Sequence, residues 1–149
     1  MFQIIHTRSF FKAREKEAIL NAIGDAEKNT SGEIRVHVES CSGIDPVVRA
    51  ETVFKNLGMA NTELHNGVLI YLAVKDRKFA IIGDEGIHRA VPSGFWDETK
   101  AGMEQLFRAG KFLEGVCLGI RLAGENLARY YPCLAGDVNE LPDEISEGR

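Results

Sequence analysis

Acidic and amide side chains stand next to three apolar runs that are typical of β-strands. Glu33 starts one run, Asn66 precedes a second that begins at Gly67, and Asp84 follows a third. The first two strands are expected to be parallel and the third to return antiparallel, so these side chains should meet at one sheet edge. Carboxylate, amide and carbonyl oxygens are the ligands that a hard cation such as calcium requires. The predicted metal ligands are Asp84, Glu85, Asn66, Glu33 and Asp97, with Ser31 at the same edge.

These residues also have an ordinary structural interpretation. Asp and Asn commonly form turns and cap helices, and their spacing here is not that of an EF-hand loop. His65 and His88 flank the same edge. They could ligate a metal or transfer a proton, although most histidines occupy surface or turn positions. Metal ligation and turn formation therefore both stay open, and no catalytic residue is predicted.

A second polar group follows the strand predicted at residues 33–39, at the opposite edge of the sheet. A helix is expected to begin after Ser42 and Asp45, and a helix start can accept an anion such as phosphate. As an N-cap, however, Asp45 would occupy the helix donors itself. The stretch from Cys41 to Arg49 superficially resembles a cysteine-phosphatase loop. An aspartate and a proline interrupt the run of backbone donors that would bind phosphate.

The pattern of apolar residues predicts the elements that position these groups. Two short runs, beginning at Gly67 and Phe79 and joined by a charged connection, indicate a hairpin that is buried on both faces. Residues 33–39 alternate between apolar and polar, which predicts a half-covered strand at an edge of the sheet. Helical spacing predicts four helices that cover a small mixed sheet in an α/β fold. They are expected at about 9–28, with Ser9 as N-cap, 45–58, 92–110 and 111–131.

The last predicted helix carries small residues at every fourth position, namely Gly115, Gly119 and Ala123. A glycine inside a helix costs about 1 kcal/mol relative to alanine, so its presence implies a reason. We expect a groove at which another backbone packs closely.

Composition indicates one domain at residues 1–132 in a chain of 149 residues with a net charge of −4. Beyond Pro132 the chain carries five carboxylates and one arginine, so residues 133–149 are expected to form an acidic, disordered tail. The body lacks the basic stripe that nucleic-acid binding requires. No run has the length of a signal-peptide core or a transmembrane helix, and the cysteines lack CxxC spacing. A cytoplasmic monomer without membrane insertion or a nucleic-acid partner is expected.

Several motifs, taken in order, resemble those of the TPM domain family over roughly residues 9–132. They are Ser31-Gly32-Glu33-Ile34, Asn66-Gly67-Val68-Leu69-Ile70, the Asp76-Arg77 hairpin, the turn between Gly83 and Gly86, and the stretch from Phe107 to Gly115. The resemblance implies a three-layer α/β/α sandwich with helices on both faces of the sheet. It also implies binding of divalent cations, calcium in particular, and the acid-phosphatase activity attributed to some plant members. Many members have aspartate where this chain has His65.

Three functional hypotheses follow. The first is a TPM domain of undefined cellular role that binds calcium through carboxylates at the Asp84 edge. The second is a metal-assisted phosphomonoesterase, in which the ion polarises a phosphoryl oxygen and activates water. The third is a non-catalytic domain that engages an unidentified protein partner.

Overall fold

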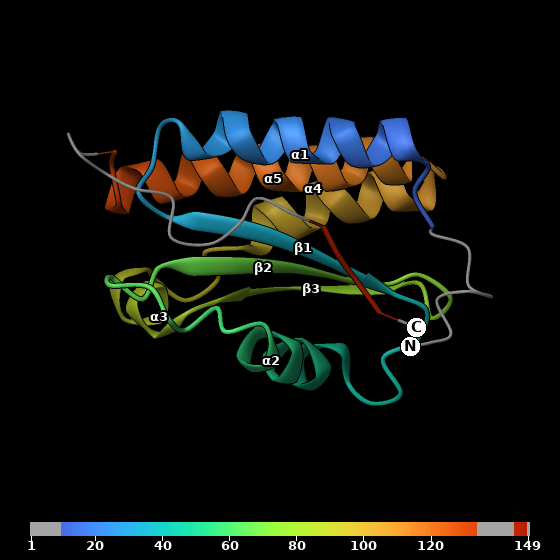
Figure 1. The fold of residues 1–149 in the computed structure, drawn as a ribbon, viewed down its shortest axis with the longest axis horizontal. Helices are drawn as coiled ribbons and strands as arrows, with labels where there is room; N and C mark the ends of the chain where they lie inside the picture. The colour runs from blue at the N-terminus through green and yellow to red at the C-terminus, as the bar shows by residue number, and fades with distance from the viewer. Residues whose placement is uncertain (1–9, 134–144, 149) are drawn as a thin grey trace.

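A small mixed sheet with helices on both faces forms the body of the protein (Figure 1). The computed structural model describes residues 10–133 and 145–148. Helices α1, α4 and α5 cover one face of the sheet and α2 covers the other, which confirms the predicted α/β class. The elements are α1 (Ala13–Glu27), β1 (Glu33–Glu39), α2 (Pro46–Asn56), β2 (Gly67–Ala73), β3 (Lys78–Gly83), α3 (Glu85–Ala90), α4 (Asp97–Arg108), α5 (Phe112–Tyr130) and β4 (Ile145–Glu147).

The described strands pair in the order β3-β2-β1-β4. Strands β1 and β2 are parallel, with Glu33 opposite Gly67, whereas β2 and β3 form the predicted antiparallel hairpin, with Val68 opposite Gly83. The expectation that β1 is a half-covered edge strand was wrong. All seven of its residues are buried, and the strand lies between β2 and β4. Its polar residues therefore belong to the interior.

The C-terminal segment corrects the expectation of a disordered tail. Residues 145–147 form β4, which runs parallel to β1 with Val36 opposite Ile145 and Val38 opposite Glu147. The Gly148 N–H extends this pairing by donating to the Val38 carbonyl at 2.6 Å. The remainder of the predicted tail, residues 134–144 and 149, lies outside the described residues. This docked strand gives β1 a second neighbour.

The first helix begins later than its apolar spacing predicted. Helix α1 starts at Ala13, where the Lys12 N–H donates to Glu15 Oε1 at 2.9 Å. Phe11 precedes the helix and is buried in the core. The predicted N-cap, Ser9, lies outside the described residues.

Alternating strand residues divide the core into two parts. Val36, Ile70 and their neighbours pack against α1, α4 and α5, whereas Leu69 and Tyr71 pack against α2. Burial on both faces explains why β2 is a continuous apolar run. Within the described residues, no helix combines the length and the apolar character needed to cross a membrane.

Close packing explains the small residues of α5, although the groove differs from the prediction. At Gly115 and Gly119, an added Cβ would lie 2.4 Å from the Phe107 ring and 2.5 Å from Met103 Sδ. Side chains of α4, rather than a backbone, therefore fill the groove at these two positions. A backbone does approach at Gly124, where an added Cβ would lie 3.2 Å from Ala26 Cα and 2.7 Å from its Cβ.

Candidate functional site

Asp84 connects the end of β3 to the start of α3 and lies at one end of the sheet. Its backbone N–H donates to the Gly67 carbonyl at 2.9 Å, which extends the β2–β3 pairing by one residue. Its side-chain Oδ1 accepts from the Glu85 N–H at 2.7 Å, as an aspartate at a helix N-cap does. These contacts hold the carboxylate in a position that is only 8% exposed.

The second carboxylate oxygen of Asp84 is the polar atom at this end that calls for an explanation. Within the described part of the chain, Oδ2 is buried and accepts no hydrogen bond. His65 Nδ1 lies 3.4 Å from it, on a residue held at a φ of +49°. Burying a carboxylate oxygen without a donor is costly, so such an atom is a candidate for contact with a cation or water.

Asn66 and Glu33 lie at the same end of the sheet as Asp84, Asn66 directly before β2 and Glu33 at the start of β1. The Glu33 N–H donates to the Asn66 carbonyl at 3.3 Å, and Asn66 Nδ2 donates to Ser31 Oγ at 3.4 Å. Both Asn66 and Glu33 are buried. Asp84, Gly67 and Glu33 form a row across the sheet, and the residue between the two acids has no side chain. The structure thus brings these predicted ligands to one edge.

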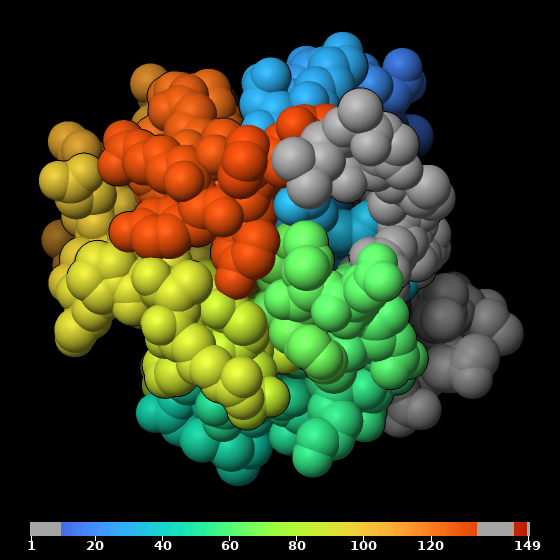
Figure 2. Space-filling view, turned by 90° about the vertical axis from the view of Figure 1, so that its left-hand side faces the viewer, coloured from blue at the N-terminus to red at the C-terminus, as the bar shows by residue number. Residues whose placement is uncertain are grey.

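Figure 2 shows this end of the molecule, where residues 60–66 (green), residues 84–96 (yellow) and the end of α5 (orange) meet. The segment that includes Leu64 and His65 packs tightly on the start of α3. An added Cβ at Gly86 would lie 2.5 Å from the Leu64 carbonyl oxygen and 2.6 Å from the His65 carbonyl oxygen. Only glycine permits this approach, which holds His65 beside Asp84.

The carboxylates of Glu85 and Asp97 do not join this arrangement. The Glu85 carboxylate is exposed and pairs with Arg89 one turn along α3. Asp97 is exposed at the start of α4, where its N–H donates to the Gly94 carbonyl at 3.0 Å. Across residues 10–133 and 145–148, no group of three or more His, Cys, Asp or Glu side chains is close enough to hold a metal ion. Asp84 is therefore the central residue of the candidate metal site at this edge.

A buried ionic network at the other end of β1 was missed by the sequence interpretation. Glu39 accepts from Arg49 Nε at 2.8 Å and Arg49 Nη2 at 2.9 Å, and also from the Tyr71 hydroxyl. His37 Nε2 lies 3.1 Å from the same carboxylate, and His37 Nδ1 lies 2.9 Å from Ser146 Oγ of β4. Alternation had placed His37 and Glu39 on a solvent-facing side. No local signal in the sequence corrects this, because the partners that bury Glu39 come from α2 and β2.

The charge state of Glu39 follows from this network. Burial alone raises the pKa of the carboxyl, but the hydrogen bonds from Arg49, His37 and Tyr71 outweigh it and lower the pKa to about 2. Burial, together with the Glu39 carboxylate, raises the pKa of Tyr71. Glu39 is thus a fixed, fully paired anion that joins β1, β2 and α2. Such a group suits a structural role rather than proton transfer.

The polar groups of the loop after β1 form hydrogen bonds with nearby residues of the chain. Asp45 caps α2 by accepting from the Val47 N–H at 2.8 Å, as predicted. The Ser42 N–H and hydroxyl both donate to Asp76 Oδ2, at 2.8 and 3.2 Å. Desolvation and a hydrogen bond with Asp76 raise the pKa of the Cys41 thiol. A nucleophilic cysteine needs a lowered pKa, so neither an anion site nor a cysteine phosphatase is favoured here.

Comparison with known proteins adds to this geometry. Residues 4–125 match the family described as TPM domain. The solved structure of BA42 protein from the psychrophilic bacterium Bizionia argentinensis is 52% identical, with a TM-score of 0.89, and the match covers 95% of this chain and 97% of that one.

Two more distant structures are N-terminal domains, one of a protein from P. gingivalis and one of cg2496 from Corynebacterium glutamicum. The first is 17% identical with a TM-score of 0.66, covering 83% of this chain and 80% of that one. The second is 16% identical with a TM-score of 0.61, covering 88% of this chain and 82% of that one. At this identity they show a common fold alone. No curated protein matches the chain.

Proposed function

Because the chain belongs to the TPM domain family, we propose that it is a divalent-cation-binding domain with Asp84 as the central ligand and calcium as the preferred ion. The observation that carries the proposal is the buried Oδ2 of Asp84, which accepts no hydrogen bond among the described residues. A bound cation would give this oxygen a contact that no hydrogen-bond donor supplies. This function is binding, and no reaction is assigned to it.

The neighbouring groups suit a hard cation. Calcium takes six to eight oxygen ligands from carboxylates, amides, carbonyls and water. Asp84 offers a carboxylate oxygen, Asn66 offers an amide, and Glu33 offers a second carboxylate on the same edge. His65 would be displaced slightly or would hold a water, because an imidazole is a poor ligand for calcium.

The expected affinity is low. Within the described ranges no cluster of three acidic, histidine or cysteine side chains is assembled in advance, so water must provide much of the coordination. Sites with few charged ligands bind calcium with a Kd of about 10⁻⁴ to 10⁻³ M. We expect this chain to fall in that range, and Asp84→Asn to weaken binding at least about tenfold.

A calcium titration followed by backbone amide chemical shifts tests the proposal. Wild type should show saturable shifts at residues 65–67 and 83–86, and Asp84→Asn should lose them. Asp97→Asn is the matched control, because Asp97 is exposed and does not contact the Asp84 carboxylate within the described structure. It should titrate like wild type. Absence of shifts at 10 mM calcium, or equal shifts in wild type and Asp84→Asn, would refute the proposal.

No feature of this edge favours either alternative function, the phosphomonoesterase or the protein-binding domain. A phosphomonoesterase needs cationic groups or metal ions that stabilise the transferring phosphoryl group. The one arginine paired near Asp84 in the described residues, Arg89, is directed to Glu85 on the exposed side of α3. A protein-binding role is likewise not indicated by the Asp84 edge, where Asp84, Asn66 and Glu33 are all buried. Calcium binding is therefore the function that we put forward.

A further inference from the structure

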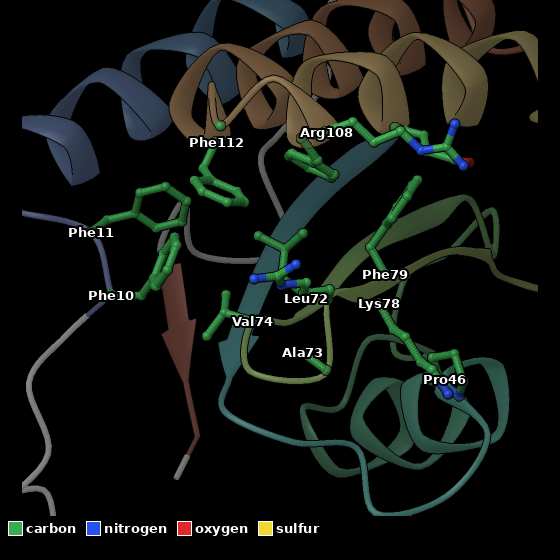
Figure 3. A pocket seen from close by; sticks show the side chains of 14 residues that line it. Phe10, Phe11, Pro46, Leu72, Ala73, Val74, Lys78, Phe79, Arg108 and Phe112 are labelled. Carbon is green, nitrogen blue, oxygen red and sulfur yellow. The ribbon is translucent and has the colours of Figure 1, made fainter.

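A cavity of about 700 Å³ opens between the helix layer and the β2–β3 hairpin (Figure 3). It lies beside Leu72 and Val74, at the end of the sheet opposite Asp84. Ligand-binding cavities in proteins typically measure roughly 300–1,000 Å³. The volume therefore suits a small molecule, and the location separates this cavity from the proposed cation site.

Five phenylalanines form most of the apolar wall. Phe10 and Phe112 meet edge to face with ring centroids 5.3 Å apart, Phe112 stacks on Phe107 at 6.0 Å, and Phe107 meets Phe79 edge to face at 5.1 Å. The fifth, Phe11, lies edge to face with Phe10 at 5.0 Å. The rings thus form a continuous aromatic surface from the helices to β3.

The outer part of this wall is exposed to solvent. Phe10 is 40% exposed and Phe112 is 41% exposed, although full burial of a phenylalanine side chain is worth about 1.5–3 kcal/mol. Both side chains point into the space between the helices and the hairpin in Figure 3. An apolar ligand in the cavity would cover them, which explains why they face an opening and not the core.

A basic side chain of the hairpin lines the same cavity. Arg77 contributes to the wall, and within residues 10–133 and 145–148 it forms no ion pair with a carboxylate. Lys78 also borders the cavity, but it lies on the sheet face that α2 covers and interacts electrostatically with Asp76. Arg108 also lines the cavity, but it is paired with Glu104 at 2.7 Å. An apolar cavity bordered by one guanidinium that has no ion-pair partner among the described residues is complementary to a ligand with an apolar body and one negative charge.

The hairpin turn determines where the Arg77 side chain lies. Arg77 has a φ of +56° in the turn where its N–H donates to the Val74 carbonyl at 3.4 Å. A residue with positive φ is common at this place in a hairpin loop, although glycine or asparagine adopts it more easily. The turn therefore places a long cationic side chain at the border of the cavity.

We propose that this cavity binds a small amphipathic monocarboxylate. The apolar body would lie against the phenylalanine rings and Leu72, and the carboxylate would pair with Arg77. A neutral lipid would leave this guanidinium without a partner, and an ammonium would be repelled by it. A single carboxylate satisfies the charge without burying a highly charged phosphate in an apolar cavity.

Three ligands with the same eight-carbon chain test this proposal, namely octanoate, octan-1-ol and octylammonium. Titration of the full chain in low salt, followed by amide and aromatic chemical shifts, gives the affinity and the location. Octanoate should bind with a Kd of about 1 mM or below and about three- to tenfold more tightly than octan-1-ol. Octylammonium should bind most weakly. Shifts should centre on residues 10–11, 72–79 and 104–112.

Two variants separate the charge from the apolar wall. The variant Arg77→Gly should bind octanoate and octan-1-ol within about twofold of each other, and its glycine relieves the positive φ, so the fold is retained. The control Arg129→Gln removes the same charge away from the cavity and should preserve the preference for octanoate. Phe112→Ser should weaken both ligands about fivefold and keep their ratio.

Three results would overturn the proposal. The first is equal binding of octanoate and octan-1-ol to the wild-type chain. The second is an unchanged ratio in the Arg77→Gly variant. The third is a set of shifts located outside the cavity. Near-UV circular dichroism of each variant verifies that the comparison is made on folded protein.

Discussion

Replacing Glu39 by glutamine should reveal how strongly the buried network stabilises this fold. The carboxylate is almost inaccessible and accepts hydrogen bonds from Arg49, Tyr71 and His37. Glutamine has nearly the same shape but no charge, so it leaves the Arg49 guanidinium without its anion. The substitution therefore perturbs the electrostatics of the network with little change in volume.

The magnitude follows from the pKa of Glu39. The value of about 2 in the folded protein lies below the ordinary 4.5, and a difference of this size corresponds to about 3 kcal/mol at 1.36 kcal/mol per pH unit. Breaking a buried ion pair by removing one partner costs roughly 3–5 kcal/mol in other proteins. Glu39→Gln should thus lower the free energy of unfolding at pH 7 by about 3 kcal/mol.

The pH dependence has a definite sign. Because the folded-state pKa is depressed, the unfolded chain takes up the proton first as the pH falls. The stabilisation by Glu39 is complete above about pH 4.5 and decreases as the pH falls towards 2. The stability difference between wild type and Glu39→Gln should therefore shrink over the same interval.

Urea unfolding at several pH values measures both effects. Glu51→Gln, an exposed substitution on α2, serves as the matched control and should change the free energy of unfolding by less than about 0.5 kcal/mol. Tyr71→Phe removes one hydrogen bond to Glu39 and should cost about 1 kcal/mol, which keeps the test available if Glu39→Gln does not fold. A Glu39→Gln variant as stable as Glu51→Gln, or a loss that is independent of pH, would refute the reasoning.

Two further predictions concern helix packing and capping. Gly124→Ala should lower the free energy of unfolding by about 1–3 kcal/mol, because the new Cβ would lie 2.7 Å from Ala26 Cβ. Gly24→Ala, with open space around its Cβ, should instead raise it by about 0.5–1 kcal/mol, and thermal unfolding of both variants compares them. Asp45→Ala should cost about 1 kcal/mol in the same assay by removing the cap on the Val47 N–H, and an unchanged stability would contradict that role.

Sequence patterns predicted the elements whose signals are local. The hairpin of β2 and β3, the Asp45 cap and the covering helices all follow from residues within a few positions of each other. The approach of Asp84 to Asn66 and Glu33 also followed, because strand direction alone determines which loops share an edge. These parts of the fold depend on spacing that can be read directly from the chain.

Other features depend on contacts between distant segments. Strand β4 pairs with β1 across more than a hundred residues, and nothing near Ile145 indicates that partner. For the same reason the polar alternation of β1 suggested an exposed face, whereas Glu39 is buried by partners from α2 and β2. The orientation of the Glu85 side chain was not predicted either. Its pairing with Arg89 depends on α3, a helix that begins at Glu85.

The central claim, that Asp84 holds a divalent cation, is tested most directly by locating a bound ion. Substoichiometric Mn²⁺ broadens the amide signals nearest to it, and excess Ca²⁺ should reverse the broadening if both ions share one site. Broadening should centre on His65, Asn66 and Asp84 and disappear in Asp84→Asn. Broadening confined to the acidic residues beyond Pro132, or unaffected by Asp84→Asn, would contradict it.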